Sequence, residues 1–313
     1  MRFFIVDAFT EEVFGGNPAG VVLIDSGSEF PSDEIMLKTA AELRYSETAF
    51  VKSLPNGSFD IRYFTPTSEV DFCGHATIGA FACMLTSGIV KKDNSYLINT
   101  LSGVLTIEID GDFIVMKMPK PKVLKSSFTI DEINEIYSSL GISYTPISLT
   151  LDDGKVVEFL PQIISAGFPD IFVPVNSQKE LANISPNFAL ISKLCETHVA
   201  GGLHAFTPAF TQSNSGSPSH VALSGEIIAH TRNFAPLFGI DEEAATGTAS
   251  GGLIYYFYKH GIIFDKPARY FLQGEAMGRP SKIYAQINIL NNKNIEIKIS
   301  GTGVILAEGE LYL

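Results

Sequence analysis

Tryptophan is absent from this chain, and only three of its 313 residues are cysteine. Cys73, Cys83 and Cys195 are odd in number and include no closely spaced pair of the metal-ligand type. A disulfide-stabilised framework and a zinc site built on a cysteine pair are therefore excluded. Reduced thiols are expected, as in a cytoplasmic protein.

Basic residues are scarce as well. The chain has 22 Lys and Arg against 34 Asp and Glu, which gives a formal net charge of −12 at pH 7. Nucleic acids and anionic membranes both bind clustered positive charge, so this balance excludes them as expected partners. A small anionic carboxylate substrate stays open, because a local pocket can oppose the overall charge.

Long apolar runs and nucleotide-binding motifs are also missing. The apolar N-terminal stretch ends at Asp7, too early for a signal peptide, and no run reaches the roughly eighteen residues of a transmembrane helix. No Gly-x-Gly-x-x-Gly motif follows a predicted strand, and no Walker-type loop occurs. With 45% hydrophobic and 18% charged residues, the composition is typical of a soluble globular protein of two domains.

One sequence pattern occurs twice. Residues 62–80 and 232–252 both begin with Arg-x-Phe-x-Pro, continue through a short acidic loop, and reach Gly-(His/Thr)-Ala-(Thr/Ser) before an apolar run. The loops differ in length, while the residues on either side of them match. The repetition predicts two lobes of similar architecture with a site between them.

Each copy of the pattern leads into a helix that is expected to be buried. The segment 76–85 is apolar on every side, and a run rich in aromatic residues follows Gly247. Short β-rich segments surround both helices, which favours an α+β fold made of two curled sheets. We expect an N-terminal lobe of residues 1–118 plus 303–313 and a C-terminal lobe of residues 119–302.

The start of each buried helix is a candidate binding site. The first amide N–H groups of a helix have no partners within it, and together with the helix dipole they attract an anion. Gly74 and Gly247 would let a ligand approach the backbone closely. A tight structural turn is the alternative for one copy alone, but two copies within matched flanks favour a functional role.

Five motifs carry a family resemblance. They are Asn17-Pro18-Ala19, Ser46-Glu47-Thr48-Ala49-Phe50, Arg62-Tyr63-Phe64-Thr65-Pro66, Cys73-Gly74-His75-Ala76-Thr77 and Thr246-Gly247-Thr248-Ala249. In this order the chain resembles the PhzF family, phenazine-biosynthesis-like proteins that share the diaminopimelate epimerase fold. The resemblance implies two pseudo-symmetric lobes, each a curled, mostly antiparallel sheet wrapped around a central buried helix. It also implies an active site between the lobes, isomerase chemistry without a cofactor, and a homodimer.

The characterised activity of this family is the isomerisation of trans-2,3-dihydro-3-hydroxyanthranilate, in which a proton moves between ring carbons. The resemblance places Glu47 at the family's acid/base glutamate and His75 at the histidine of the first helix start. Glu243 falls where family members commonly carry Asp, and Thr248 where they commonly carry Ser. Glu47, His75 and Glu243 are the expected catalytic residues: Glu47 would carry the proton, and the other two would orient and polarise the substrate. The implied substrate-binding residues are Asn17, Ser46, Gly74, Gly247 and Thr248. A purely structural turn explains Asn17 equally well.

The chemistry of these side chains agrees with such roles. Acid/base catalysis favours a carboxyl group in an apolar setting, which is expected for Glu47. Imidazole titrates near neutrality and a helix N-terminus disfavours its cation, so a neutral His75 is expected. The alternatives are a solvated or capping glutamate, a capping histidine and, for Glu243, an acid favoured only by the helix dipole. Arg62 and Arg232 are interpreted as structural salt-bridge residues rather than substrate ligands.

No metal and no cofactor are expected. His198 and His204 lie six residues apart across a glycine loop, which is not a metal-site spacing. Diaminopimelate epimerases and proline racemases use two cysteines, one at each helix start, but here the counterpart of Cys73 is Thr246. A threonine hydroxyl cannot act as a thiolate-type base near neutral pH, so Cys73 is expected to be a buried packing residue. An epimerase or racemase, and a non-catalytic small-ligand binding protein on the same fold, are the alternatives.

Overall fold

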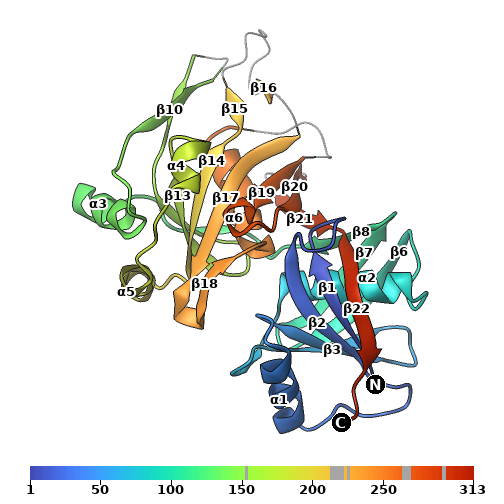
Figure 1. Ribbon diagram of the computed structural model, residues 1–313. Coiled ribbons are helices and arrows are strands. Elements are labelled where there is room, and N and C mark those ends of the chain that lie inside the picture. The colour runs from blue at the N-terminus through green and yellow to red at the C-terminus, as the bar shows by residue number, and fades with distance from the viewer. Residues whose placement is uncertain (152–153, 212–221, 224–225, 263–268, 291–293) are drawn as a thin grey trace. The chain divides into compact units, whose positions relative to one another are not determined.

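The computed structural model describes residues 1–313 except 152–153, 212–221, 224–225, 263–268 and 291–293. The chain forms two compact units (Figure 1). Unit 1 comprises Met1–Lys117 and Ser300–Leu313, and unit 2 comprises Met118–Ile299. Each unit is a curled β-sheet around one buried helix, so the predicted α+β fold class is confirmed.

The sheet of unit 1 is mostly antiparallel. Its strands are β1 (Arg2–Ala8), β2 (Asn17–Leu23), β3 (Thr48–Ser53), β4 (Phe59–Phe64), β5 (Glu69–Val70), β6 (Asn94–Thr100), β7 (Gly103–Asp110), β8 (Phe113–Lys117) and β22 (Gly303–Glu310). Neighbours run in the order β22-β1-β2-β3-β4-β6-β7-β8, and β5 pairs with the end of β4. The pairs β2–β3 and β4–β6 are parallel, and the other pairs are antiparallel.

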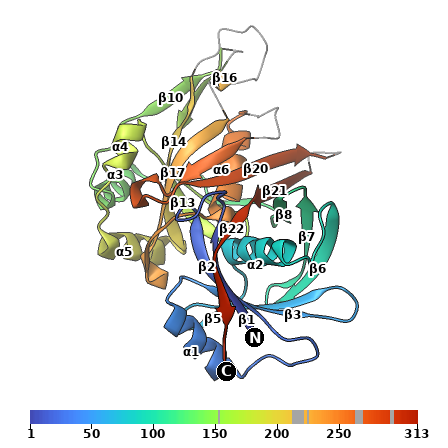
Figure 2. The ribbon, with the colours of Figure 1, turned by 45° about the vertical axis from the view of Figure 1, so that its right-hand side comes forward.

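Helix α2 (Gly74–Thr86) lies within the curl of this sheet and packs against β1, β2 and β22 (Figure 2). Every residue from His75 to Met84 is buried, because a helix enclosed by a sheet has no side that faces water. Gly79 allows a close approach to β1, since a Cβ there would lie 3.4 Å from the Cβ of Val6. Helix α1 (Asp33–Leu43) packs against β3 and β4.

The sheet of unit 2 follows the same plan. Its strands are β9 (Lys122–Lys125), β12 (Gln162–Ser165), β13 (Pro169–Pro174), β14 (Gly202–Pro208), β17 (Ile227–Ala235), β18 (Ile240–Glu243), β19 (Tyr270–Gln273), β20 (Ser281–Ile289) and β21 (Ile295–Gly301). Two separate antiparallel pairs accompany it, β10 (Ile147–Thr150) with β11 (Val156–Phe159) and β15 (Phe210–Thr211) with β16 (Ala222–Leu223). The pairings of β1 to β7 recur here in the same order. They are antiparallel β12–β13, parallel β13–β14, antiparallel β14–β17, antiparallel β17–β18, parallel β17–β19 and antiparallel β19–β20.

Helix α6 (Gly247–Lys259) is the buried helix of unit 2 and packs against β12, β13 and β20. Gly252 lets it come close to β13, since a Cβ there would lie 2.5 Å from Cζ of Phe172. The other helices are α3 (Ile130–Ser139), α4 (Gln178–Ala182), α5 (Phe188–His198) and the 3-10 helices η1 (Pro236–Phe238) and η2 (Glu275–Met277). Helices α3, α4, α5 and η1 contribute to a hydrophobic core of unit 2, in which side chains of α3 and α5 pack on β13 and β14. No helix in the described part of the chain is long and apolar enough to cross a membrane.

The arginines of the repeated pattern form equivalent ion pairs. Arg62 donates from Nε and Nη2 to the two carboxylate oxygens of Glu69, at 2.7 and 2.6 Å. Arg232 binds the two oxygens of Glu242 in the same way, at 2.8 and 2.7 Å. The interpretation of both arginines as salt-bridge residues is therefore confirmed.

Candidate active site

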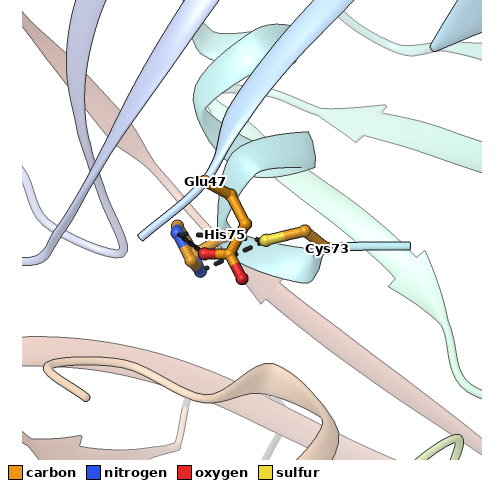
Figure 3. Close-up of side chains that lie close together, drawn as sticks. All are labelled: Glu47, Cys73 and His75. Atoms are coloured by element: carbon orange, nitrogen blue, oxygen red, sulfur yellow. Dashed lines mark hydrogen bonds and ion pairs between the residues drawn. The ribbon is translucent and has the colours of Figure 1, made fainter. Parts of the chain in front are cut away.

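The start of α2 and the start of β3 bring the candidate residues of unit 1 together. Cys73 is the N-cap of α2 and makes no side-chain cap bond to the helix, so the first amide N–H groups are not satisfied by that side chain. Glu47 directly precedes β3, and its carbonyl oxygen accepts a hydrogen bond of 3.2 Å from the backbone N–H of Gly20. The sheet thus fixes the backbone from which the Glu47 side chain points to the helix start (Figure 3).

The imidazole of His75 is the centre of this cluster. Its Nε2 lies 3.3 Å from Oε2 of Glu47 and 3.3 Å from Oγ of Ser46. The thiol of Cys73 lies on the same ring, with Sγ 3.4 Å from Nδ1 and 3.9 Å from Nε2. Figure 3 shows the carboxylate, the imidazole and the thiol pointing toward one another. The structure therefore brings together three predicted site residues, Ser46, Glu47 and His75.

Water has little access to this cluster. The side chains of His75 and Glu47 are 5% and 12% exposed. Burial lowers the pKa of His75 below its ordinary value, while the nearby Glu47 acts in the opposite direction and is the smaller effect. His75 is thus a neutral imidazole at pH 7, as predicted, with one ring nitrogen that donates and one that accepts.

One oxygen of the Glu47 carboxylate is an exception to normal hydrogen bonding. Among the residues that the structure describes, Oε2 is buried and has no hydrogen-bond partner, although it lies at ion-pair distance from His75. Buried carboxylate oxygens nearly always accept a hydrogen bond, because leaving one without a donor costs free energy. This atom is therefore suited to accept a hydrogen bond from a bound ligand.

Gly74 and Asn17 are the remaining predicted residues of unit 1. Gly74 is the first residue of α2, and a Cβ there would lie 3.6 Å from Cε of Met116. Asn17 is buried at the start of β2, where Ala8 is its cross-strand partner. Gly74 therefore forms the helix start itself, and a role of Asn17 in the site stays a prediction.

The start of α6 in unit 2 holds a different polar network. Its N-cap residue, Thr246, donates from Oγ1 to Oε2 of Glu243 at 3.1 Å and does not cap the helix. The buried side chain of Gln273 donates to the carbonyl oxygen of Glu243 at 2.7 Å and to Oγ1 of Thr246 at 3.0 Å. It also accepts from the backbone N–H of Thr246 at 3.3 Å. The Glu243 carboxylate is thereby tied to the helix start.

Gly247 and Thr248 are the first two residues of α6. Thr248 lies beside Gly167, whose φ is +118°, and a Cβ on that glycine would lie 3.6 Å from Cγ2 of the threonine. Within unit 2 the structure therefore places Glu243, Gly247 and Thr248 around one helix N-terminus, as the repeated pattern predicts.

Two features of the site were missed by the sequence reasoning. Gln273 lies far from the repeated pattern, and its only local signal is the Gly274 that follows it with a φ of +81°. Cys73 is buried as expected, but it also contacts His75, so its role is not packing alone. Among the described residues, Glu47, Cys73 and His75 are one group that could hold a metal ion, with ligand atoms within 4.8 Å of one another.

Comparison with known proteins shows the family of the chain. The PhzC-PhzF family model, described as phenazine biosynthesis-like protein, matches residues 6–309. An uncharacterised isomerase of Clostridium acetobutylicum is 33% identical, over 98% of this chain and 97% of that protein. The trans-2,3-dihydro-3-hydroxyanthranilate isomerase of Pseudomonas aeruginosa is 27% identical, over 100% of this chain and 99% of that protein.

Solved structures extend the comparison. A PhzF family protein of Bacillus anthracis is 25% identical, with a TM-score of 0.80, and the match covers 100% of this chain and 99% of that chain. A probable proline racemase of Agrobacterium radiobacter has a TM-score of 0.58 at 11% identity, over 100% of this chain and 93% of that chain, which shows a shared fold alone. The chain belongs to the PhzC-PhzF family, and it is an isomerase.

Proposed function

We propose that this isomerase moves a proton between carbon atoms of a small unsaturated carboxylate, and that Glu47 carries the proton. The observation that supports the proposal most directly is the buried Oε2 of Glu47, to which no group in the described ranges of the chain donates a hydrogen bond. A carboxylate oxygen in this state keeps a lone pair available for a substrate proton. The reaction class rests on the isomerases to which the chain is related.

The proposed step balances without a cofactor. Glu47 removes a proton from a carbon whose C–H bond is acidified by the neighbouring unsaturated acid. The electron pair left behind moves the double bond, and the protonated Glu47 then returns the proton to another carbon on the same face. The N–H groups at the start of α2 would stabilise the negative charge that develops in between.

His75 is proposed to orient the substrate and to polarise it. Its neutral form matters, because a cationic imidazole 3.3 Å from Glu47 would hold the carboxylate in an ion pair and weaken it as a base. Burial maintains that neutral form. Ser46, 3.3 Å from the same ring nitrogen, would set the orientation of the ring or bind substrate.

In unit 2, Glu243, Gly247 and Thr248 are proposed to bind substrate groups. The bonds from Thr246 and Gln273 restrict the motion of Glu243, so it is suited to accept a hydrogen bond from an amino or hydroxyl group. The first N–H groups of α6, which have no partner within the helix, and the Thr248 hydroxyl are suited to a carboxylate. The homodimer that the family resemblance implies stays a prediction, which the molar mass of the purified chain in solution would check.

A reaction in deuterated water tests the proposal against its alternatives. The probe is trans-2,3-dihydro-3-hydroxyanthranilate, the compound in the name of the Pseudomonas aeruginosa relative. Proton transfer between carbons moves a double bond, so the ultraviolet spectrum changes and NMR shows a new C–H or C–D position. An epimerase would instead invert and label one stereocentre with the spectrum unchanged. A binding protein would bind the compound, as measured by calorimetry, and leave both signals unchanged.

A further inference from the structure

We propose that Glu47, Cys73 and His75 form a binding site for a divalent transition-metal ion of the zinc class. They offer a carboxylate, a thiolate and an imidazole, which are the three side-chain groups that bind zinc in proteins. Their ligand atoms lie within 4.8 Å of one another. Neither the family nor the relatives' names assign a metal to these residues.

The contact between Glu47 and His75 has the length expected between two ligands of one tetrahedral ion. Zinc bonds of about 2.0–2.3 Å at tetrahedral angles separate neighbouring ligand atoms by about 3.3–3.6 Å. Oε2 of Glu47 lies 3.3 Å from Nε2 of His75, within this range. Sγ of Cys73 lies 3.9 Å from the same nitrogen and 3.4 Å from Nδ1, so the thiol must move toward Nε2 before all three atoms can bind one ion.

The site is also largely formed before an ion arrives. Cys73 and His75 are fixed two residues apart at the start of α2, and Glu47 is fixed by the hydrogen bond at the edge of β3. Because these backbones are held by secondary structure, little conformational freedom is lost on binding. Three protein ligands leave one position for water or for the hydroxyl of Ser46, which lies 3.3 Å from Nε2.

Electrostatics and hydrogen bonding favour an ion here as well. A carboxylate and a thiolate together cancel the charge of a divalent cation, so the buried site stays neutral overall. The buried Oε2 of Glu47, which has no hydrogen-bond partner, would gain the ion as its partner. This unpartnered atom is the observation that separates the cluster from an ordinary packing contact.

Occupancy has a consequence that rests on the proposed function. An ion bound to Oε2 of Glu47 takes the lone pair that would accept the substrate proton. The metal-bound form is therefore inactive, and the ion acts as a reversible inhibitor rather than as a cofactor.

Cobalt(II) provides a direct test, because a thiolate ligand gives it an intense charge-transfer band in the near ultraviolet. The reduced full-length chain, freed of metal with a chelator, is titrated with CoCl₂. We expect one equivalent to bind with this band and ZnCl₂ to displace it. Cys73→Ser removes the band, and Glu47→Gln weakens binding by more than about tenfold. Cys195→Ala, which removes a buried thiol of unit 2, is the matched control and keeps the band.

Two outcomes would overturn the site: a band that survives in Cys73→Ser, or no saturable cobalt binding to the folded wild-type chain. Thermal unfolding shows whether each variant is folded, and it gives a second measure of binding because a bound ion stabilises only the chain that binds it. ZnCl₂ should raise the unfolding temperature of the wild type and of Cys195→Ala, and should leave Cys73→Ser unchanged. A chain that binds cobalt but has no isomerase activity even when it is free of metal would count against the proposed function and leave the metal site standing.

Discussion

Arg62 on β4 and Arg232 on β17 hold the same place in their two units, each bound to both carboxylate oxygens of one glutamate. Each guanidinium also lies over the phenylalanine two residues further along its strand, at 5.2 Å for Phe64 and 5.1 Å for Phe234. Their surroundings differ. The Arg62 side chain is 24% exposed and the Arg232 side chain 9%. Arg232 also donates to the backbone carbonyl groups of two residues of unit 2.

This difference predicts unequal losses of stability. Arg232→Met leaves the Glu242 carboxylate, which is only 14% exposed, without its cation. This costs about 3–5 kcal/mol of unfolding free energy, the range for a broken buried ion pair. Arg62→Met should cost clearly less unfolding free energy, because the Glu69 side chain is 21% exposed and water screens its charge. Urea unfolding of both variants measures the two losses. Equal losses, or a larger loss for Arg62→Met, would contradict this account of the pairs.

The glycines at equivalent places in α2 and α6 give a second matched pair. A Cβ on Gly252 would lie 2.5 Å from Cζ of the buried Phe172 ring, so Gly252→Ala should cost about 1–3 kcal/mol through overpacking. A Cβ on Gly79 would meet Val6 at 3.4 Å, an ordinary contact. Gly79→Ala should therefore be neutral, or stabilising by up to about 1 kcal/mol through helix propensity. Thermal unfolding that ranks the two variants the other way would show that the helices pack differently.

Asp170 predicts an unusual dependence of stability on pH. It is buried on β13, no described residue forms a hydrogen bond with its Oδ2, and burial raises its pKa to about 7. The unfolded chain loses this proton near pH 3.9. Between about pH 4 and pH 7 the folded state holds a proton that the unfolded state has released, so this residue's contribution to stability falls as pH rises, by up to ~1.4 kcal/mol per pH unit.

Asp170→Asn removes that titration. The variant should gain stability relative to the wild type as pH rises from about 4 to 7, with the difference constant above that range. The measurement is the unfolding free energy of both proteins at each pH. Taking the difference at one pH cancels the contribution of the buried His204, whose pKa is lowered to about 3 by burial. A difference that does not change with pH would show that Asp170 is not protonated in the folded chain.

Much of the fold follows from the sequence, because a repeated motif and two apolar helices are local signals. The sequence marks 76–85 as a buried segment, and the structure buries residues 75–84 of α2. The network of Gln273 could not be predicted, since nothing in its neighbourhood indicates that β19 lies next to β17. The contact between Glu47 and His75 also depends on strand pairing, here the parallel register of β2 with β3. Such long-range pairings have no local sequence signature.

The same limit explains the treatment of Cys73. As a single cysteine it reads as a small buried residue, and its burial is confirmed. Its proximity to His75 was visible in the motif, but the third member of the cluster, Glu47, is 26 residues away in the chain. Only the fold shows that a carboxylate joins the thiol and the imidazole.

The rate of isomerisation by a Glu47→Gln variant in deuterated water most directly tests the claim that Glu47 carries the proton. Glutamine keeps the size of the side chain and cannot accept a proton, so the account predicts a loss of about 10²–10⁴-fold in the rate of isomerisation in deuterated water. Glu42→Gln, which changes an exposed glutamate of α1, is the matched control and should keep the wild-type rate. A Glu47→Gln enzyme that isomerises and labels the substrate at the wild-type rate would contradict the account.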